Sequence, residues 1–353
     1  FSSIQKANFS LGESDSSLGD LRGHWKEACL LFDENLAEGV INQAFAFANP
    51  ETVCHEIFLK GMLEIGESWY QGKVSVQQEH FAAGVARRRL GSLISSTPPA
   101  NRAETILVCC PPGEEHSLPG TCLTFLLRRQ GYKVIDLGAN VPIAQLKETA
   151  ESIHPWLVIL SAQQLSSAVQ IGRCAQALAD SSPIGFGGRI FKVSPGLTKH
   201  IPAYFLGDTL EGASKAVEDI LLHKNHFSIT DEGENLLRDL YEIFELNRHA
   251  IHSQLPTRSS TSELQGGIHD EITLFMNNSV AAALYFGDLD LLLPEMDWME
   301  GFLHNRQYGY QQASEPWSIY IDSVNKVIGQ EAAPILNWFD LHLSRHNQPG
   351  KDS

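Results

Sequence analysis

Residues 105–120 read TILVCCPPGEEHSLPG, an apolar run that passes directly into a polar loop. A short continuous apolar run of this kind is typical of a strand that is buried on both faces, as in a parallel sheet. The loop that follows carries Glu114 and, two residues later, His116. A histidine at this position can leave one ring nitrogen free as a metal ligand while the acidic residue receives the other ring N–H. The run therefore predicts a buried strand with a candidate ligand-binding loop at its carboxyl end.

Outward from this strand, strand-like and helical segments alternate along residues 103–225. Further strands are expected at residues 133–137, 156–161, 183–187 and 203–205, and helices at residues 119–130, 145–153, 168–178 and 210–222. This alternation predicts a doubly wound, five-stranded parallel sheet of the Rossmann-like kind. Because ligands of such sheets bind at the carboxyl ends of the strands, the functional loops are expected after Cys110, Leu137, Ser161 and Gly187.

The residues on either side of the predicted sheet favour helices. Apolar residues recur at helical spacing through residues 21–97, which predicts a four-helix bundle that ends in a Thr-Pro-Pro linker. Residues 1–20 are Ser-rich and weakly patterned, and we expect a disordered lead-in there. Residues 230–346 show helical spacing without strand alternation and predict a C-terminal helical domain. The expected fold class is α/β plus all-α.

The net charge of the 353 residues is −16, and residues 226–353 contribute −12 of it, with 19 acidic and 7 basic side chains. A domain that binds nucleic acid directly is expected to be basic, so the acidic third argues against that partner. No run of 18 or more apolar residues occurs, which argues against a membrane span. The six cysteines lack CxxC spacing and fit a reducing, cytoplasmic setting.

Two more loops at the predicted sheet edge carry small or polar residues. The third strand ends in the sequence SAQQL, residues 161–165, and the fourth ends in Gly187 and Gly188. Small residues there would let a bulky group approach the backbone closely. A histidine in an exposed loop is by itself more often plain polar surface than a ligand. The case for His116 therefore rests on the three loops together.

This set of a histidine loop, a serine loop and paired glycines resembles the cobalamin-binding domain shared by methionine synthase, the cobalamin mutases and corrinoid proteins. The resemblance covers residues 103–224. It implies that His116 is the lower axial ligand of the cobalt, in place of the cofactor's own dimethylbenzimidazole, with Glu114 as its partner. Around the displaced nucleotide tail it implies Gly120, Ser161, Gln163, Leu165, Gly187 and Gly188. The family usually places the first glycine three residues after the histidine, whereas Gly120 stands four residues after His116.

The helical part carries a second motif, in which Trp69 is followed after nine residues by Glu79 and His80. Without context, a core tryptophan and a solvated Glu-His pair would account for it. Ahead of a cobalamin domain, the spacing resembles the MerR-type cobalamin photoreceptors that control carotenoid genes. The resemblance implies that the bundle caps the upper face of adenosylcobalamin, with Trp69 and Glu79 packed on its 5′-deoxyadenosyl group.

Two features depart from those photoreceptors. Their DNA-binding winged helix does not occur in these residues, and Tyr70 stands where they have the histidine that captures cobalt after light breaks the cobalt–carbon bond. Tyr70 is a poor replacement ligand, so water or another group such as His80 is expected in that position. The resemblance implies a light sensor rather than an enzyme, and a homo-oligomer whose assembly changes with light.

The C-terminal third resembles the photocobilins, which pair a cobalamin domain with a biliverdin site, in the sequences DWME at residues 297–300 and ILNWF at 335–339. The resemblance implies biliverdin as a second chromophore, without a thioether link in this region because no cysteine follows Cys174. The candidate cations for its propionates are Arg248, Arg258, Arg306 and Arg345. The candidate imidazoles beside its pyrrole nitrogens are His249, His252, His269 and His304. A dimerisation or signal-transmitting bundle without a ligand is the alternative.

A corrinoid methyl carrier that works with methyltransferases shares the bundle-plus-sheet layout and is the alternative function. The Trp69 motif and the acidic helical third count against it, because a methyl-carrying protein needs no adenosyl pocket. A mutase subunit is disfavoured, because 353 residues leave no room for a substrate barrel beside these domains. The sequence therefore predicts a cobalamin-based light sensor.

Overall fold

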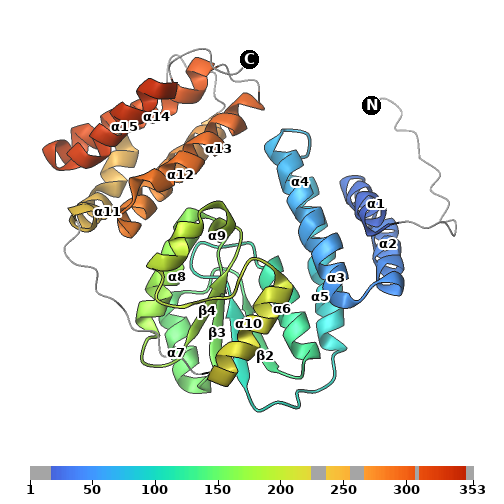
Figure 1. The fold of residues 1–353 in the computed structure, drawn as a ribbon. Coiled ribbons are helices and arrows are strands. Elements are labelled where there is room, and N and C mark those ends of the chain that lie inside the picture. Colours follow the sequence, from blue (N-terminus) through green and yellow to red (C-terminus); the bar gives the residue numbers. More distant parts are fainter. Residues whose placement is uncertain (1–16, 224–235, 255–265, 307–309, 347–353) are drawn as a thin grey trace, which may run out of the picture.

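The computed structural model describes residues 17–223, 236–254, 266–306 and 310–346 (Figure 1). These residues form a helical bundle, a central α/β domain and a C-terminal group of helices. In Figure 1 the bundle lies on one side of the central sheet, beside α6, and the C-terminal helices lie on the side of α8. None of the described helices is long and apolar enough to cross a membrane.

The central domain contains five parallel strands in the spatial order β2-β1-β3-β4-β5. The strands are β1 (Thr105–Cys109), β2 (Lys133–Gly138), β3 (Leu157–Ser161), β4 (Ile184–Gly187) and β5 (Tyr204–Phe205). The connecting helices are α6 (Leu118–Arg129), α7 (Ile143–Ile153), α8 (Leu165–Ala177), α9 (Ile190–Val193) and α10 (Leu210–His223), with a 3-10 turn η2 (Pro195–His200) after α9. The prediction of a doubly wound five-stranded parallel sheet is confirmed. The chain order reverses between β1 and β3, and such a switch point is where these folds bind ligands.

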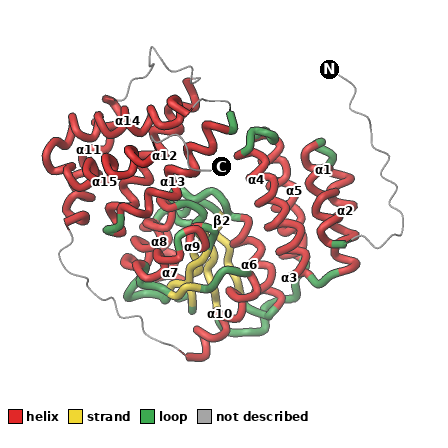
Figure 2. The backbone as a smooth tube through the Cα atoms, turned by 45° about the horizontal axis from the view of Figure 1, so that its top comes forward, coloured by secondary structure: helices red, strands yellow, loops and turns green. Residues whose placement is uncertain are grey.

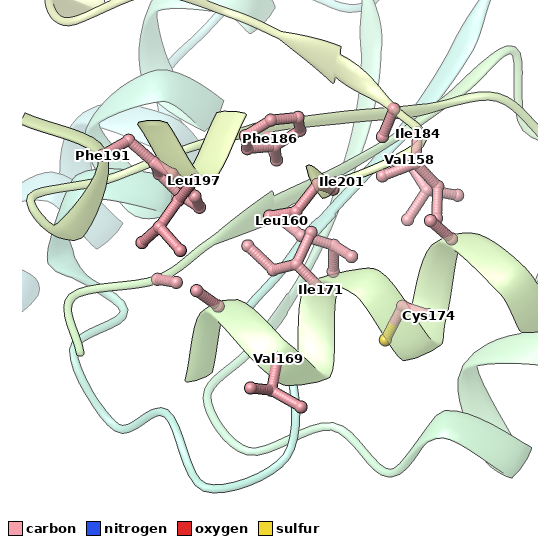
Figure 3. Close-up of a cluster of buried hydrophobic side chains, with 14 of the residues drawn as sticks. Val158, Leu160, Val169, Ile171, Cys174, Ile184, Phe186, Phe191, Leu197 and Ile201 are labelled. Atoms are coloured by element: carbon pink, nitrogen blue, oxygen red, sulfur yellow. The ribbon is translucent and has the colours of Figure 1, made fainter. Parts of the chain in front are cut away.

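Both faces of the sheet are covered by helices, so successive strand residues pack into two different cores. Ile106 and Val108 of β1 pack in the core formed with α6 and α10, whereas Leu107 packs in the core formed with α7 and α8. Figure 3 shows part of the second core, in which Leu160 of β3 faces Ile171 of α8. All six cysteines of the chain are free and buried.

The bundle is built from four helical stretches, which lie side by side in Figure 2. They are α1 (Leu18–Leu30), α2 (Glu34–Phe47), the run of α3 (Pro50–Val53), the π-helical turn η1 (Cys54–Leu59) and α4 (Lys60–Tyr70), and α5 (Val76–Ser95). The Ser17 hydroxyl caps α1 by accepting a hydrogen bond of 3.2 Å from the Asp20 N–H. The expected disordered lead-in is therefore wrong for residues 17–20, and residues 1–16 lie outside the described part of the chain.

The C-terminal domain is all-helical in its described residues, as predicted. It contains α11 (Leu236–Gln254), α12 (Gly266–Phe286), α13 (Leu292–His304), α14 (Tyr310–Ile328) and α15 (Ala333–His346), with 3-10 turns η3 (Leu289–Leu291) and η4 (Gly329–Ala332). Its helix α12 packs on α8, because Ala282 and Phe286 belong to the same buried core as that helix. Arg173 of α8 also donates a hydrogen bond to the Tyr241 hydroxyl of α11. These contacts dock the C-terminal domain on the central domain.

Candidate functional site

The loop after β1 is held by one buried carboxylate. Glu114 is 1% exposed, and its Oε1 lies 2.5 Å from Nδ1 of His116 and 3.0 Å from the backbone N–H of the same residue. Its Oε2 accepts hydrogen bonds from the Gln163 N–H and the Ser167 hydroxyl, both at 2.7 Å. Glu114 thus ties the loop after β1 to the start of α8, the helix that follows β3.

Glu114 is ionised despite its burial. Burial alone would raise the pKa of Glu114, but hydrogen bonds from His116, Gln163 and Ser167 outweigh that effect and hold the pKa below its usual value. A carboxylate can only accept, so Nδ1 of His116 carries the proton. The same hydrogen bond is the largest cause that raises the pKa of His116, and the charges of Glu114 and Glu79 add to it, while burial and Arg189 oppose it.

The other ring nitrogen of His116 is available as a ligand. The side chain is 55% exposed, and its Nε2 has no hydrogen-bond partner among the described residues. When a carboxylate holds the Nδ1–H of a histidine, the ring is oriented to bind a metal through Nε2. A corrin ring supplies four nitrogens of its own, so one oriented imidazole fits the axial position that remains on one face of its cobalt. The residues of this loop therefore fit a cobalamin.

Asn140, two residues after the end of β2, supports the histidine loop and was not predicted as a site residue. Its backbone lies in the left-handed region, with φ +54°. From there its Oδ1 accepts a hydrogen bond from Gly113 N–H at 2.9 Å, and its own N–H donates to the Glu114 carbonyl at 3.0 Å. Asparagine adopts this conformation more readily than most residues, so an Asn shortly after a predicted strand was the available signal.

The serine and glycine loops form a second hydrogen-bonded group at the same edge. The Ser161 hydroxyl accepts from Nε2 of Gln163 at 3.1 Å, and Oε1 of Gln163 accepts from the Arg189 N–H at 3.2 Å. Arg189, which follows the paired glycines, was not predicted as a site residue. Its charge acts on both His116 and Glu295 of α13, so it lies between the central and C-terminal domains.

Of the predicted residues at this edge, Gly120, Gly188 and Leu165 are closely packed within the fold. A Cβ at Gly188 would lie 2.0 Å from the Ala162 carbonyl oxygen, so the close approach here is by the chain itself rather than by a bulky group. A Cβ at Gly120 would lie 3.2 Å from Val108, which places α6 tightly on β1. Leu165 is 1% exposed within the core of the sheet. Gly187 is less tightly packed, since a Cβ there would meet only the Gly207 carbonyl oxygen, at an ordinary contact distance of 3.7 Å.

The bundle residues of the second motif lie at the facing ends of α4 and α5. Glu79, in the first turn of α5, is close enough to His116 for its charge to act on that side chain. His80 is 73% exposed, and its Nε2 lies 3.6 Å from the Glu79 carboxylate. Trp69 and Tyr70 end α4, where their rings contact Phe302 of α13 with centroid distances of 5.5 and 6.4 Å. The C-terminal domain therefore meets the bundle at Trp69.

The candidate bilin partners that the structure describes make contacts in different places. Arg248 pairs with Glu245 at 3.2 Å and donates to Asn278, and Arg306 donates to backbone carbonyls of the bundle. The described imidazoles among the candidates are all exposed: His249, His252 and His304. Arg258 lies outside the described residues, as do the side chains of His269 and Arg345.

The carboxyl group of Glu295, on α13, is expected to make the stability of the fold depend on pH. Burial raises the pKa of Glu295, and the hydrogen bond from Ser279 at 3.1 Å and the charge of Arg189 offset only part of this. For a carboxyl with a raised pKa, stability is fully present below the ordinary value of 4.5 and is lost as the pH rises through the raised pKa. We expect Glu295→Gln to be more stable than the unmutated protein at pH 8 and equal to it near pH 4.

Urea unfolding midpoints at the two pH values would measure this difference. Asp297→Asn, an exposed change on the same helix, is the matched control and should show no such gain at pH 8. A Glu295→Gln protein that is less stable than the unmutated one at pH 8 would mean that the ionised carboxylate is stabilised by its surroundings.

Comparison with known proteins finds a matching family model and several similar proteins. The family model of the B12 binding domain matches residues 22–94, the helical bundle. CarH, an HTH-type transcriptional repressor of Myxococcus xanthus, is 29% identical over 180 residues, which are 48% of this chain and 60% of CarH. The trimethylamine corrinoid protein of Methanosarcina barkeri is 30% identical over 151 residues, 41% of this chain and 69% of that protein. The structure of the monomethylamine corrinoid protein of Methanosarcina barkeri covers 58% of this chain and 100% of its own, with 17% identity and a TM-score of 0.51.

A bundle that matches the B12 binding domain, next to a doubly wound sheet, defines a cobalamin-binding protein. The identity with the trimethylamine corrinoid protein extends over more than two thirds of that relative. The chain therefore belongs to the corrinoid protein family. It spans 60% of the length of CarH, and the likeness to the solved structure shows the fold alone.

Proposed function

We propose that the protein is a light sensor that holds adenosylcobalamin between the bundle and the carboxyl edge of the sheet. When bound, adenosylcobalamin supplies a cobalt–carbon bond that visible light breaks. The observation that carries the proposal is the position of Trp69. It lies at the end of α4 and contacts Phe302 of the C-terminal domain, while the charge of Glu79, in the first turn of α5, acts on His116. A change above the cobalt thus has a direct route to a third domain.

Each residue of the candidate site has a role in this proposal. His116 is the lower axial ligand, and Glu114 fixes its tautomer and orientation. Trp69 and Glu79 cover the upper face, since a large flat ring suits an adenosine. The nucleotide tail lies along the serine and glycine loops, next to Ser161, Gln163, Gly187 and Gly188, with Gly120 and Leu165 packed beneath. The Tyr70 ring is packed against α13, which leaves water or His80 for the light-state ligand position.

The output follows from the domain contacts. The bundle and the C-terminal domain meet at Trp69, so loss of the adenosyl group changes the balance between two arrangements of these domains. A ligand state shifts such a balance only by its difference in affinity for the two arrangements, here about 1–5 kcal/mol. We place the sensor in the cytoplasm as a homo-oligomer whose assembly changes with light, with its effector outside this chain.

Biliverdin as a second chromophore in the C-terminal domain is part of the same proposal. Besides the resemblance in residues 297–300 and 335–339, one structural feature supports a ligand there. The Nε1 of Trp317 is buried and has no hydrogen-bond acceptor among the described residues. A buried donor of this kind is usually satisfied, and a ligand carbonyl would satisfy it. A far-red absorption band that stays with the protein through gel filtration would support the bilin, and its absence would leave the ligand-free helical domain.

Replacement of Trp69 tests the upper-face assignment. Trp69→Ala should weaken binding of adenosylcobalamin by about tenfold or more, since a stacked aromatic partner is lost. Methylcobalamin, which has no adenosine to stack, should bind nearly unchanged. Absorption titrations in the dark would give both dissociation constants, with Trp156→Ala on the central domain as the matched control. Equal weakening of both forms would remove the argument for an adenosyl pocket.

A corrinoid methyl carrier is the second candidate, because the trimethylamine corrinoid protein is a relative of similar identity. The two functions differ in their response to light. In the sensor, illumination with adenosylcobalamin bound should change the absorption spectrum permanently and shift the elution volume on gel filtration. A carrier should show only the photolysis that the free cofactor shows, and it should accept a methyl group from a methyltransferase system.

A further inference from the structure

Arg306 joins the C-terminal domain to the last turn of the bundle helix α4. Its Nη2 donates to the Trp69 carbonyl at 3.2 Å, and its Nη1 donates to the Tyr70 carbonyl, also at 3.2 Å. The same Nη1 lies 3.2 Å from the Phe302 carbonyl, one turn back on α13. One guanidinium therefore bridges carbonyls from two domains that are more than 230 residues apart in the chain.

The last carbonyls of a helix have no partner within the helix and carry partial negative charge. At the end of α4, Trp69 O accepts from the Gly72 N–H at 2.9 Å, and the chain then turns away at Gly72 with φ +71°. Among the residues that the structure describes, the donors to the Tyr70 carbonyl are Arg306 and, at 3.5 Å, Asn305, both from the other domain. A cation that donates two hydrogen bonds suits this position electrostatically as well as geometrically.

The guanidinium also fixes the rings at this junction. It lies 3.5 Å from the centroid of the Phe302 ring and 5.3 Å from that of Trp69. The two rings are themselves 5.5 Å apart. Cation–π contacts within about 6 Å are attractive and favour one ring orientation. Arg306 thus restrains both the backbone and the indole ring of Trp69.

A close contact at Gly301 sets the position of α13 against the same turn. A Cβ at Gly301 would lie 1.9 Å from the Tyr70 hydroxyl, so the tyrosine occupies the space that a side chain would fill. The Tyr70 ring also lies 5.6 Å from that of Trp298. The chain is therefore seated on the end of α4 at two points five residues apart, Gly301 of α13 and Arg306 just after that helix.

We propose that Arg306 is a positioning residue for Trp69, through which the C-terminal domain sets the selectivity of the upper face of the corrinoid site. The proposal rests on the proposed function, in which Trp69 covers the adenosyl group. Arg306 itself touches no cofactor and acts through the backbone and ring of Trp69. Selectivity for the adenosyl form is thereby a property of two domains rather than of the bundle alone.

The test compares Arg306→Gln, Arg306→Lys and the control Arg87→Gln, which removes an exposed arginine of α5. The first readout is the ratio of the dissociation constants of adenosylcobalamin and methylcobalamin in the dark. Loss of the two charge-assisted hydrogen bonds in Arg306→Gln should reduce this selectivity by about tenfold. Arg306→Lys keeps the charge but lacks the two-pronged guanidinium that reaches both the Trp69 and the Tyr70 carbonyls. It should therefore retain only part of the selectivity. Arg87→Gln should leave the ratio unchanged.

The second readout uses the cofactor-free protein. Hydrogen exchange of the amides in residues 70–74 should be faster in Arg306→Gln than in the unmutated protein, because the turn after Trp69 is no longer held. Unchanged exchange would mean that Arg306 does not hold this turn and would overturn the proposal. Faster exchange with equal weakening of both cobalamins would give Arg306 a merely structural role and overturn the proposal. If the unmutated protein bound adenosylcobalamin and methylcobalamin equally, the proposed adenosyl pocket would fail. The exchange result would still decide whether Arg306 holds the turn after Trp69.

Discussion

His116→Ala should weaken cobalamin binding by more than about 100-fold. Loss of an outer partner of a metal ligand commonly costs 10–100-fold in affinity, and here the ligand itself is removed. The fold should survive, because the His116 side chain is 55% exposed and Glu114 keeps its hydrogen bonds from Gln163 and Ser167. Titration of the cofactor-free protein with aquocobalamin, followed by absorption, would measure both the affinity and the change in the cobalt spectrum.

Two controls make this prediction specific. His249→Ala removes an exposed imidazole of the C-terminal domain and should leave the titration unchanged. Imidazole added to the His116→Ala protein should recover part of the original spectrum, because the free base can occupy the vacated position below the cobalt. If His116→Ala bound cobalamin with the spectrum and affinity of the unmutated protein, the axial ligand would have to be another residue.

Gly188→Ala should lower the free energy of unfolding by about 3 kcal/mol or more. The backbone of Gly188 has φ +127°, a conformation open to glycine and strained for any residue with a Cβ. The new methyl group would also lie 2.0 Å from the Ala162 carbonyl oxygen at the end of β3. The new methyl group can be accommodated only if the loops after β3 and β4 move apart. The change should therefore lower the stability and also disrupt the hydrogen-bonded group around Ser161.

Gly187→Ala is the matched control for this change. Gly187 lies outside the left-handed region, and its added Cβ would meet only the Gly207 carbonyl oxygen at 3.7 Å, an ordinary contact. Urea unfolding followed by circular dichroism should therefore show a large loss of stability for Gly188→Ala and a small change for Gly187→Ala. Equal effects of the two changes would mean that the loop after β4 relaxes and that neither glycine is required by the backbone.

The centre of the sheet was predictable because β1 and β3 are buried on both faces. Residues 105–110 formed an unbroken apolar run, and the observed β1 (Thr105–Cys109) ends one residue earlier. The short helix α9 (Ile190–Val193) was missed because four residues are too few to show a helical period. The start of α1 was not predictable, because its cap Ser17 is one of many serines in a segment that otherwise lacks a pattern.

The loops of the candidate site were predictable where they follow predicted strands, but individual contacts were predictable only between residues close together in the chain. Glu114 and His116 share one loop, so their pairing could be expected from spacing. Ser167 completes the Glu114 network from a helix 53 residues away, and Arg306 reaches Trp69 from 237 residues away. No local pattern marks either residue, since a serine in a first helical turn and an arginine near a helix end are ordinary there. Only the packing of the domains brings them to the site.

The burial of every native thiol has a practical consequence for labelling this protein. Burial raises the pKa of Cys29, Cys110 and Cys174 to about 12, and the thiolate is the form that reacts with maleimides. The folded chain should therefore behave toward such reagents as if it had no cysteine. A single cysteine in place of Leu246, which is 86% exposed on α11, would then be the only modified position. A fluorophore or spin label attached there would report on the C-terminal domain with all six native cysteines in place.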